Sequence, residues 1–200
     1  MLTTQDLANG VDRMVAGIAP IRDALNAADR RLGDGDTGMT IEQVVQAWDA
    51  VAPDAMADVG EALVALGRQT ARATGSSLGS VLAIGLSAAG RAVRGQPALD
   101  RAGMVTALGA AGDAIVTRSG ASFGDKTVLD SIAHIKEGLA AAPDDANLYD
   151  VTLQAAEQAL DAFREREARI GRARMYGAKS AGFDDPGMLA VVLLLKAARR

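Results

Sequence analysis

The chain has 200 residues, of which 49% are hydrophobic but only one is Trp, two are Tyr and three are Phe, so its length fits one domain and its composition favours helices over sheets. The 21 basic and 25 acidic residues are interspersed and give a formal charge of −4, which excludes the basic block and aromatic platform of a nucleic-acid-binding surface. Cysteine is absent, which excludes disulfides and thiolate metal sites and fits a reducing compartment.

Apolar residues recur at helical spacing from the start of the chain. Thr3 or Thr4 can cap a first helical segment. The single apolar face of that segment is formed by Val11, Met14, Val15, Ile18 and Leu25. Its opening residues include acids and no long apolar stretch, so we expect no signal peptide. Further helical patterns cover residues 40–52, 57–73, 77–93, 99–118, 126–141, 145–168 and 187–198.

The pattern predicts a fold class without sheets. No run alternates apolar and polar residues for long enough to form a convincing strand, and the breaks between helical patterns are short. The longest apolar run, residues 188–195, is too short to span a bilayer. We therefore predict an all-α protein of about eight helices, a single domain over residues 1–200, cytoplasmic and without a membrane or nucleic-acid partner.

Four of the breaks contain more polar and glycine residues than a helix connection requires. They read "GDGDTG", "TGSS", "SGASFGDKT" and "GRARMYGAKSAGFDDPG". Glycine and serine at the start of a helix leave backbone N–H groups that commonly hold phosphate oxygens. Carboxylates in the same breaks cannot hold phosphate, but they can hold Mg²⁺, which prefers oxygen ligands and bridges to phosphate. The combination predicts a magnesium–nucleotide site at one end of a helical bundle.

Three aspartates, Asp29, Asp34 and Asp36, stand within eight positions of the chain. They repel one another, and in the sequence only Arg30 and Arg31 lie near enough to relieve them. Each aspartate alone could be an ordinary loop residue or helix cap, yet for the group a metal cluster is the more economical interpretation. The only histidine, His134, falls inside a helical pattern and is interpreted as structural or exposed rather than catalytic.

Standard motifs do not explain these breaks. "GDGDTG" matches the glycine spacing of a dinucleotide-binding turn, but charged helical residues precede it where a buried strand is required. "GDKT" lacks the glycine register and the strand of a P-loop. An EF-hand loop that starts at Asp34 would need a glutamate where Val45 stands.

Taken together, the four motifs resemble the L subunit of dihydroxyacetone kinase, the nucleotide-binding half of that kinase family. The likeness covers nearly the whole chain in the same order, and its most specific parts are "LNAADRRLGDGDTG", "TGSS", "GDKTVLD" and "GRARMYGAKSAGFDDPG". The resemblance implies a barrel of eight antiparallel helices with a nucleotide, ATP or ADP, bound at one rim.

The resemblance also implies the site residues. Asp29, Asp34 and Asp36 match three loop aspartates that bind two Mg²⁺ ions against the nucleotide phosphates. Phosphate contacts are implied for Thr37, Gly38, Met39, Thr40, Ser76 and Ser77. Gly120 and Val128 match positions that flank the adenine, and the site is completed by Arg172, Asp185, Pro186 and Gly187. No catalytic side chain is implied, because phosphoryl transfer depends mainly on positioning and electrostatics.

In this family the acceptor ketose is held covalently by a histidine of a separate K-type subunit or domain, which this chain lacks. The resemblance therefore implies a K-type partner that carries dihydroxyacetone or a related short ketose. Three positions depart from common patterns: Leu78 replaces a glycine, Val128 a methionine, and Thr37 the histidine of phosphotransferase-system versions. The phosphate donor stays open between ATP and tightly held ADP recharged by a phosphocarrier protein, and the oligomeric state stays open between monomer and homodimer.

A second hypothesis comes from a different class of function. The chain could be a non-catalytic helical binding module that holds an apolar or lipid-like ligand. Such a module would not need the aspartate triplet together with Arg172 and "DPG". Loss of magnesium-dependent nucleotide binding in Asp34→Asn would therefore distinguish the kinase hypothesis from the binding module.

Overall fold

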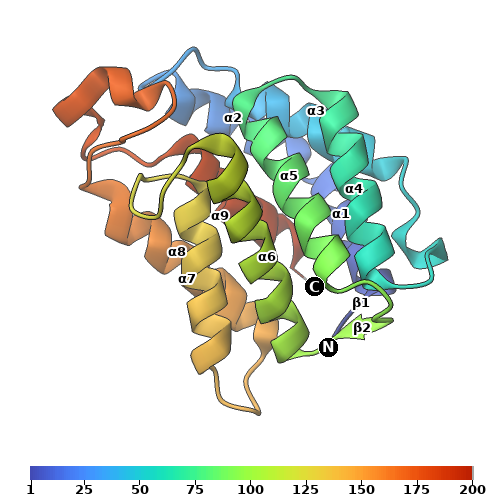
Figure 1. The fold of residues 1–200 in the computed structure, drawn as a ribbon. Coiled ribbons are helices and arrows are strands. Elements are labelled where there is room, and N and C mark those ends of the chain that lie inside the picture. Colours follow the sequence, from blue (N-terminus) through green and yellow to red (C-terminus); the bar gives the residue numbers. More distant parts are fainter. Residues whose placement is uncertain (200) are drawn as a thin grey trace.

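Helices form nearly all of the regular structure in residues 1–199, the part of the chain that the computed structural model describes (Figure 1). Within these residues the α-helices are α1 (Thr4–Ala16), α2 (Ile18–Asp29), α3 (Thr37–Asp49), α4 (Val59–Ala73), α5 (Ser77–Ala92), α6 (Arg101–Ser119), α7 (Val128–Ala141), α8 (Leu148–Arg164) and α9 (Pro186–Ala198). Two 3₁₀ segments, η1 (Pro53–Ala55) and η2 (Ala173–Ser180), and two-residue strands β1 (Leu2–Thr3) and β2 (Ala98–Leu99) complete the chain. The predicted all-α class is confirmed.

The first helical segment differs from its prediction, because it is two helices rather than one. The Gly17 N–H donates to the Arg13 carbonyl at 3.0 Å and closes α1, and α2 starts at the next residue. The apolar spacing continues across this break because both helices pack on the same core, where Val11 and Leu25 are buried. At the N-terminus of α1, Thr3 forms the predicted cap as a capping box with Asp6.

One short strand pair lies outside the sequence prediction. Leu2 pairs with Leu99 and Thr3 with Ala98 in an antiparallel ladder. Two residues per strand are too few to produce a visible alternation of apolar and polar residues, which is why the pattern did not reveal them. The ladder joins the start of α1 to the residue before the cap of α6.

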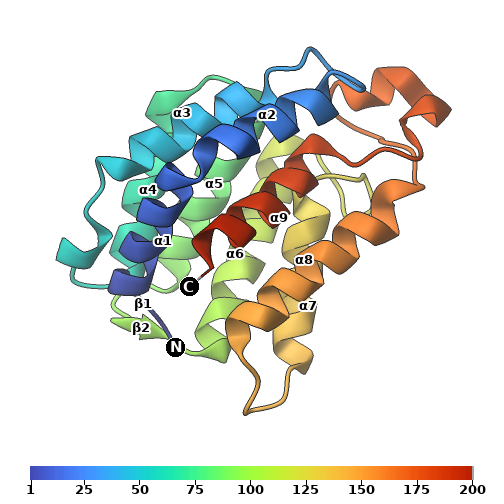
Figure 2. The same cartoon turned by 180° about the vertical axis from the view of Figure 1, so that it is seen from behind.

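The helices pack in a closed circuit. Each helix from α3 to α8 packs on the next along the chain, α9 packs on α1, α2, α7 and α8, and α2 packs on α3 (Figure 2). From α3 onwards, consecutive helices run in opposite directions. As a result α3, α5, α7 and α9 all begin at the end that is uppermost in Figure 1. The barrel implied by the family resemblance stays a prediction.

The most apolar helix, α9, lies between two parts of the core (Figure 2). Ala190 packs in the cluster built by α1, α2 and α3, whereas Met188 and Val192 pack in the cluster of α7 and α8. Burial on both sides explains why its sequence is apolar around much of its circumference, and each large side chain so buried stabilises the fold by about 1.5–3 kcal/mol. None of the described helices is long and apolar enough to cross a membrane.

At the end of the bundle opposite to the starts of α3, α5, α7 and α9, helices α4 and α5 come into backbone contact through two glycines. A Cβ atom placed on Gly60 would lie 2.5 Å from the Gly90 carbonyl oxygen, and one on Gly90 would lie 2.5 Å from the Gly60 carbonyl oxygen. Neither position can carry a side chain without separating the two helices. This contact fixes the close packing of α4 on α5.

Candidate metal and nucleotide site

The three predicted metal ligands are brought together at the upper end of the bundle. Asp29 ends α2, and Asp34 and Asp36 follow in the loop that leads to α3. One carboxylate oxygen from each lies within 4.8 Å of the others. Asp29 is buried while Asp34 and Asp36 are exposed, so the cluster faces solvent from a fixed base. An all-carboxylate set of this kind suits a hard cation such as Mg²⁺.

Asp29 also shapes the loop that carries the other two aspartates. Its Oδ2 accepts hydrogen bonds from the backbone N–H groups of Asp36, at 2.9 Å, and Thr37, at 3.1 Å. Gly33 packs directly against the same carboxylate, since a Cβ there would lie 2.2 Å from Asp29 Oδ1. The interpretation of Asp36 as an ordinary helix cap fails, because its side chain makes no capping hydrogen bond to α3.

The cation that relieves this cluster comes from far along the chain. The guanidinium of Arg172 forms an ion pair with Asp34 and lies 3.6 Å from an Asp36 carboxylate oxygen. The neighbouring arginines, which the sequence suggested for this task, point elsewhere. Arg30 packs beneath Gly35, and Arg31 lies over the Phe183 ring at 5.4 Å from its centroid. Arg172 is therefore the cation that pairs with the exposed carboxylates of this cluster.

A cavity of about 520 Å³ opens beside the cluster. Asp29, Asp36 and Arg172 form part of its wall. Four helices begin in that wall, at Thr37 for α3, Ser76 and Ser77 for α5, Thr127 for α7, and Asp185 for α9. Because helix N-termini carry partial positive charge and N–H donors, their convergence favours an anionic group in the cavity.

Another part of the same cavity is apolar. Its wall there is formed by Leu32, Leu78, Val81, Ile84, Ile115, Ala121, Val128 and Ile170. Two positions that depart from the family pattern meet at this wall around a glycine. A Cβ on Gly187 would lie 3.5 Å from Leu78 Cδ1 and 3.8 Å from Val128 Cβ. The cavity thus combines a charged mouth with an apolar surface, and its volume is within the range of small-ligand pockets.

The start of α9 brings a carboxyl group into this wall. Asp185 Oδ1 accepts the Met188 N–H at 2.8 Å and caps the helix. Burial raises the pKa of Asp185 from 3.8 to about 6, although hydrogen bonds from the Met188 and Gly187 N–H groups favour the charged form. The side chain therefore titrates near neutral pH.

Most of the predicted nucleotide residues line the cavity, and a few do not. Those in the wall are Thr37, Thr40, Ser76, Ser77, Val128, Arg172, Asp185, Pro186 and Gly187. Gly38 instead packs on α2, where its N–H donates to Asn26 Oδ1 at 2.8 Å. Met39 is 54% exposed, and Gly120 is the left-handed cap of α6 with φ of 72°, between the lining residues Ser119 and Ala121.

Sequence reasoning missed several residues of this end of the molecule. Arg118 and Thr127 line the cavity, and Asn26 supports the first turn of α3 from α2. Asn26 stands three positions before Asp29, so helical spacing alone could have placed both on one face. Lys126, which directly precedes Thr127, is buried, and its place in the motif "GDKT" did not predict that burial.

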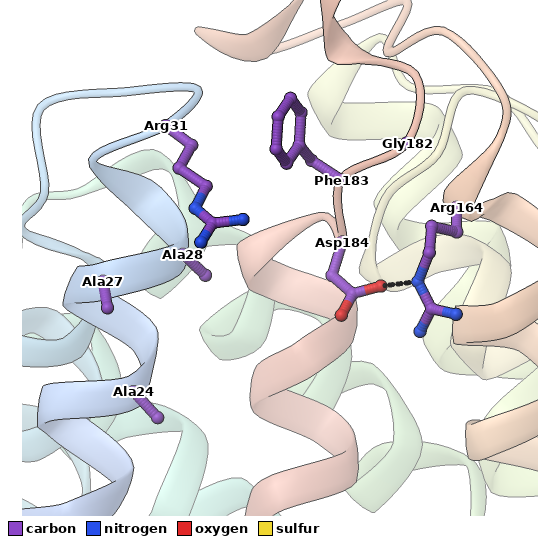
Figure 3. A pocket seen from close by; sticks show the side chains of 8 residues that line it. All are labelled: Ala24, Ala27, Ala28, Arg31, Arg164, Gly182, Phe183 and Asp184. Atoms are coloured by element: carbon purple, nitrogen blue, oxygen red, sulfur yellow. Dashed lines mark hydrogen bonds and ion pairs between the residues drawn. The ribbon is translucent and has the colours of Figure 1, made fainter.

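A second hollow, of about 440 Å³, lies on the outer side of the segment that leads into α9 (Figure 3). Figure 3 shows Ala24, Ala27 and Ala28 of α2 on one wall, opposite Phe183 and Asp184. The Asp184 carboxylate pairs with Arg164 at 2.7 Å, the dashed contact in the figure. These contacts hold residues 183 and 184 against α8 and α2, immediately before the Asp185 cap.

The sequence profile of the DAK2 domain matches residues 31–200, which is most of the chain. This protein belongs to the DAK2 domain family. The expected resemblance to the L subunit of dihydroxyacetone kinase is confirmed at this level, since the match covers three of the four motifs in full and part of the first.

Relatives of this DAK2 domain include longer kinases and one separate subunit. It is 33% identical to L-erythrulose 1-kinase of Mycolicibacterium smegmatis over 86% of this chain and 31% of that kinase. It is 28% identical to triokinase/FMN cyclase of Mus musculus over 98% of this chain and 35% of that protein. The ADP-binding subunit DhaL of the PEP-dependent dihydroxyacetone kinase of Escherichia coli is 27% identical, over 86% of this chain and 84% of the subunit.

Solved structures share the fold of this DAK2 domain. The native dihydroxyacetone kinase of C. freundii superposes with a TM-score of 0.74 at 21% identity, over 98% of this chain and 35% of that chain. The same kinase in complex with AMP-PNP and Mg²⁺ gives a TM-score of 0.71 at 23% identity, over 95% of this chain and 32% of that chain. The chain therefore spans about a third of the length of these kinases and most of the length of the separate subunit.

Proposed function

We propose that this DAK2 domain is the nucleotide-binding phosphotransferase subunit of a dihydroxyacetone or related short-ketose kinase. It would bind ATP or ADP with Mg²⁺ and pass a phosphoryl group to a hydroxyl of a ketose held on a separate K-type subunit. The observation that carries the proposal is the cluster of Asp29, Asp34 and Asp36 at the mouth of a cavity where four helices begin. A carboxylate cluster beside converging helix N-termini suits a metal–polyphosphate ligand better than either component alone.

Each part of the cavity has a role in this proposal. Asp29, Asp34 and Asp36 would hold two Mg²⁺ ions, which when bound supply positive charge against the polyphosphate. Phosphate oxygens would be received by the residues of α3 and α5 that line the cavity, Thr37, Thr40, Ser76 and Ser77. The apolar wall near Val128 and the exposed cap at Gly120 would flank the adenine, with Arg172 and Asp185–Gly187 completing the site.

The acceptor must come from elsewhere. His134 packs edge to face on Phe163, with 5.7 Å between ring centroids, and its Nδ1 lies 3.0 Å from the Asp130 carbonyl oxygen. It does not line the cavity, so this chain offers no histidine to hold a ketose at the phosphate. Positioning of donor and acceptor is the main demand of phosphoryl transfer, which is why a partner can supply the acceptor without any covalent group from this chain.

The names of the relatives support the substrate class. They include an erythrulose kinase, a triokinase and a subunit of a dihydroxyacetone kinase, all of which concern short sugars. The separate subunit belongs to a PEP-dependent system and is named for binding ADP. Because this chain matches that subunit over most of its length, the proposal extends to ADP recharged by a phosphocarrier protein, in the cytoplasm, with directly bound ATP as the other donor.

The apolar wall does not call for a separate lipid-binding function. Ile84, Ile115 and Val128 belong to the same cavity as Asp29 and Arg172. One ligand with an apolar base and a metal-bound polyphosphate would account for both surfaces, whereas a lipid-like ligand would leave the carboxylates without a role.

Calorimetric titration of the purified chain with ADP and ATP, in Mg²⁺ and in EDTA, tests the proposal. We expect magnesium-dependent binding, and a loss of at least 100-fold in Asp34→Asn because a charged ligand oxygen is removed while the loop keeps its shape. Asp145→Asn, in the exposed α7–α8 connection at the other end, is the matched control and should bind like the wild type. A folded wild type that binds a fatty acid but no nucleotide would replace the kinase proposal with the binding module.

The donor can be decided with the same preparation. ADP that remains bound through gel filtration and does not exchange with labelled ADP would support recharging by a phosphocarrier protein. Free exchange of ATP would support direct transfer from ATP.

A further inference from the structure

A buried lysine directly precedes two residues of the cavity wall, Thr127 and Val128. Lys126, in the connection between α6 and α7, is only 1% exposed. Its ammonium donates to the carbonyl oxygens of Arg164 at 2.9 Å, Arg166 at 2.8 Å and Ser180 at 2.9 Å. An ammonium has three hydrogens, so these three carbonyls use its full donor capacity.

The three carbonyls come from two places that are distant along the chain. Arg164 is the last residue of α8, and Arg166 lies two positions later. Ser180 is the last residue of η2. The ammonium therefore closes residues 165–180 into a loop by holding both of its ends. Two further contacts act at the same junction: the Gly182 N–H donates to the Arg164 carbonyl at 2.9 Å, and the Ala168 N–H donates to Ser180 Oγ at 2.9 Å.

The backbone on both sides of Lys126 is held by a buried carboxylate. Asp130, 2% exposed, accepts the N–H groups of Gly124 at 2.5 Å and Thr127 at 2.8 Å through its two oxygens. The backbone of Lys126 adopts a φ of 65°, which side-chain-bearing residues rarely take unless their surroundings require it. The connection before α7 is thus constrained on one side by Asp130 and on the other by the carbonyls around the ammonium.

The geometry excludes Lys126 from direct contact with a ligand. It does not line the cavity, and its three hydrogens are already engaged. Burial of the ammonium lowers the pKa of Lys126, while the charges of Asp185, Asp184 and Glu165 oppose that change. Burial of a charged ammonium is unfavourable, and this one does not line the cavity. Its role is therefore sought in the backbone segments that it holds together.

The elements joined by Lys126 carry residues from both parts of the cavity. Thr127 and Val128, which follow it directly, lie in the cavity wall. The loop that it closes contains Arg172, which reaches Asp34 and Asp36, and the chain then continues to the Asp185 cap. Without the ammonium, the Arg172 loop would keep one backbone contact to this connection, in which the Arg169 N–H donates to the Asp125 carbonyl at 3.1 Å.

We propose that Lys126 is a positioning residue for nucleotide binding, because its ammonium fixes the loop of residues 165–180 relative to α7 and so places Arg172 beside the carboxylate cluster. The proposal rests on the proposed nucleotide function for its consequence, but the loop contacts on which it depends are independent of that function.

Two measurements on Lys126→Met test this role. Hydrogen exchange of peptides from residues 165–185, without nucleotide, should become at least tenfold faster, because the loop opens without global unfolding. The dissociation constant for ADP with Mg²⁺, measured well below the unfolding temperature, should rise at least tenfold. Lys179→Met removes an exposed lysine from the same loop and is the matched control, with both values expected within twofold of the wild type.

The outcomes separate a positioning role from a general contribution to stability. A folded Lys126→Met with a lower unfolding temperature, but wild-type exchange in the loop and wild-type nucleotide affinity, would overturn the proposal. If Lys126→Met does not fold, Lys126→Gln replaces the ammonium by a neutral amide with two N–H donors, so at most two of the three carbonyls keep a donor. Lys126→Gln should then raise both loop exchange and the dissociation constant at least threefold, and unchanged values would overturn the proposal as well.

Failure of the nucleotide function itself would be recognised separately. A wild type that binds no nucleotide would reject the proposed function. The exchange measurement would still decide whether Lys126 holds the loop, and unchanged exchange in the variant would reject that role on its own.

Discussion

The two ends of the helical bundle use the same local chemistry to begin their helices. At the lower end of Figure 1, helices α4, α6 and α8 are capped by the side chains of Asp58, Asp100 and Asn147. At the upper end, α5, α7 and α9 are capped in the same way by Ser76, Thr127 and Asp185. Capping residues alone therefore do not mark a site, because each helix needs them wherever it starts.

The ends differ in what surrounds those caps. At the lower end, α4 and α5 are in backbone contact at Gly60 and Gly90. The upper end holds a cavity and three carboxylates within 4.8 Å, together with Arg172 from a separate loop. Three like charges within 4.8 Å repel one another and by themselves give the fold no stability, which favours a cationic ligand at this end.

The first prediction concerns the contact between α4 and α5 at the lower end. Gly60→Ala should lower the free energy of unfolding by about 2 kcal/mol, because the new Cβ meets the Gly90 carbonyl oxygen. The same change at Gly109, where the nearest contact of a Cβ is 3.9 Å away on Lys136, should be neutral or stabilise by up to about 1 kcal/mol. Denaturant unfolding measures both, and equal effects would contradict the close helix contact. Nucleotide affinity below the unfolding temperature should not change.

The second prediction concerns nucleotide and metal binding at the upper end. Arg172→Ala should weaken binding of ADP with Mg²⁺ about tenfold, a loss of about 1.4 kcal/mol, because a cation beside the phosphates is removed. Binding of Mg²⁺ alone should strengthen, since Arg172 no longer competes for Asp34. Calorimetry gives both constants, and Arg174→Ala, an exposed neighbour, is the control. If both constants weakened together, Arg172 would not be a competitor of the metal.

A pair of cap substitutions compares the two ends directly. Asp58→Ala and Ser76→Ala should each lower the free energy of unfolding by about 1 kcal/mol, because each removes one capping hydrogen bond. Only Ser76→Ala should also weaken nucleotide binding, since Ser76 lines the cavity. Thermal unfolding and calorimetry on the two variants measure this. Equal nucleotide affinity in both would remove Ser76 from the site.

The last prediction concerns pH. Because the pKa of Asp185 is about 6 in the folded protein and near 3.8 when unfolded, unfolding releases up to about one proton between these values. Asp185 therefore makes stability fall as pH rises from about 4 to about 6. Asp185→Asn keeps a cap and should remove this component, whereas Asp100→Asn at the lower end should retain it. Denaturant unfolding across this pH range would contradict the assignment if Asp185→Asn kept the wild-type slope.

Much of the fold could be predicted because it is local. Helical periodicity placed α3 to α9 to within a few residues, and Thr3 was one of the two residues expected to cap the first helix. The break at Gly17 was missed because α1 and α2 pack on one core and keep one apolar face between them. The ladder of Leu2 with Leu99 was missed because partners so far apart leave no pattern within either segment.

The candidate site divides in the same way. Asp29, Asp34 and Asp36 could be recognised because they are close together in the chain, and like charges at that spacing need an explanation. Their cation could not, because Arg172 and Asp34 are brought together only by the loop that follows α8. Lys126 carries no sign in the sequence that its ammonium is buried, since its three acceptors are backbone carbonyls that any residue could supply.

The sequence by itself thus determined the helical class, the approximate positions of α3 to α9 and the presence of three clustered carboxylates, because these depend on spacing and side-chain chemistry within a few turns. Only the tertiary structure decided that four helix starts line one cavity and that Arg172 pairs with the carboxylates of Asp34 and Asp36. It also decided that a buried ammonium joins two segments near that cavity. These features depend on contacts between distant residues, and such contacts follow from how the whole chain packs.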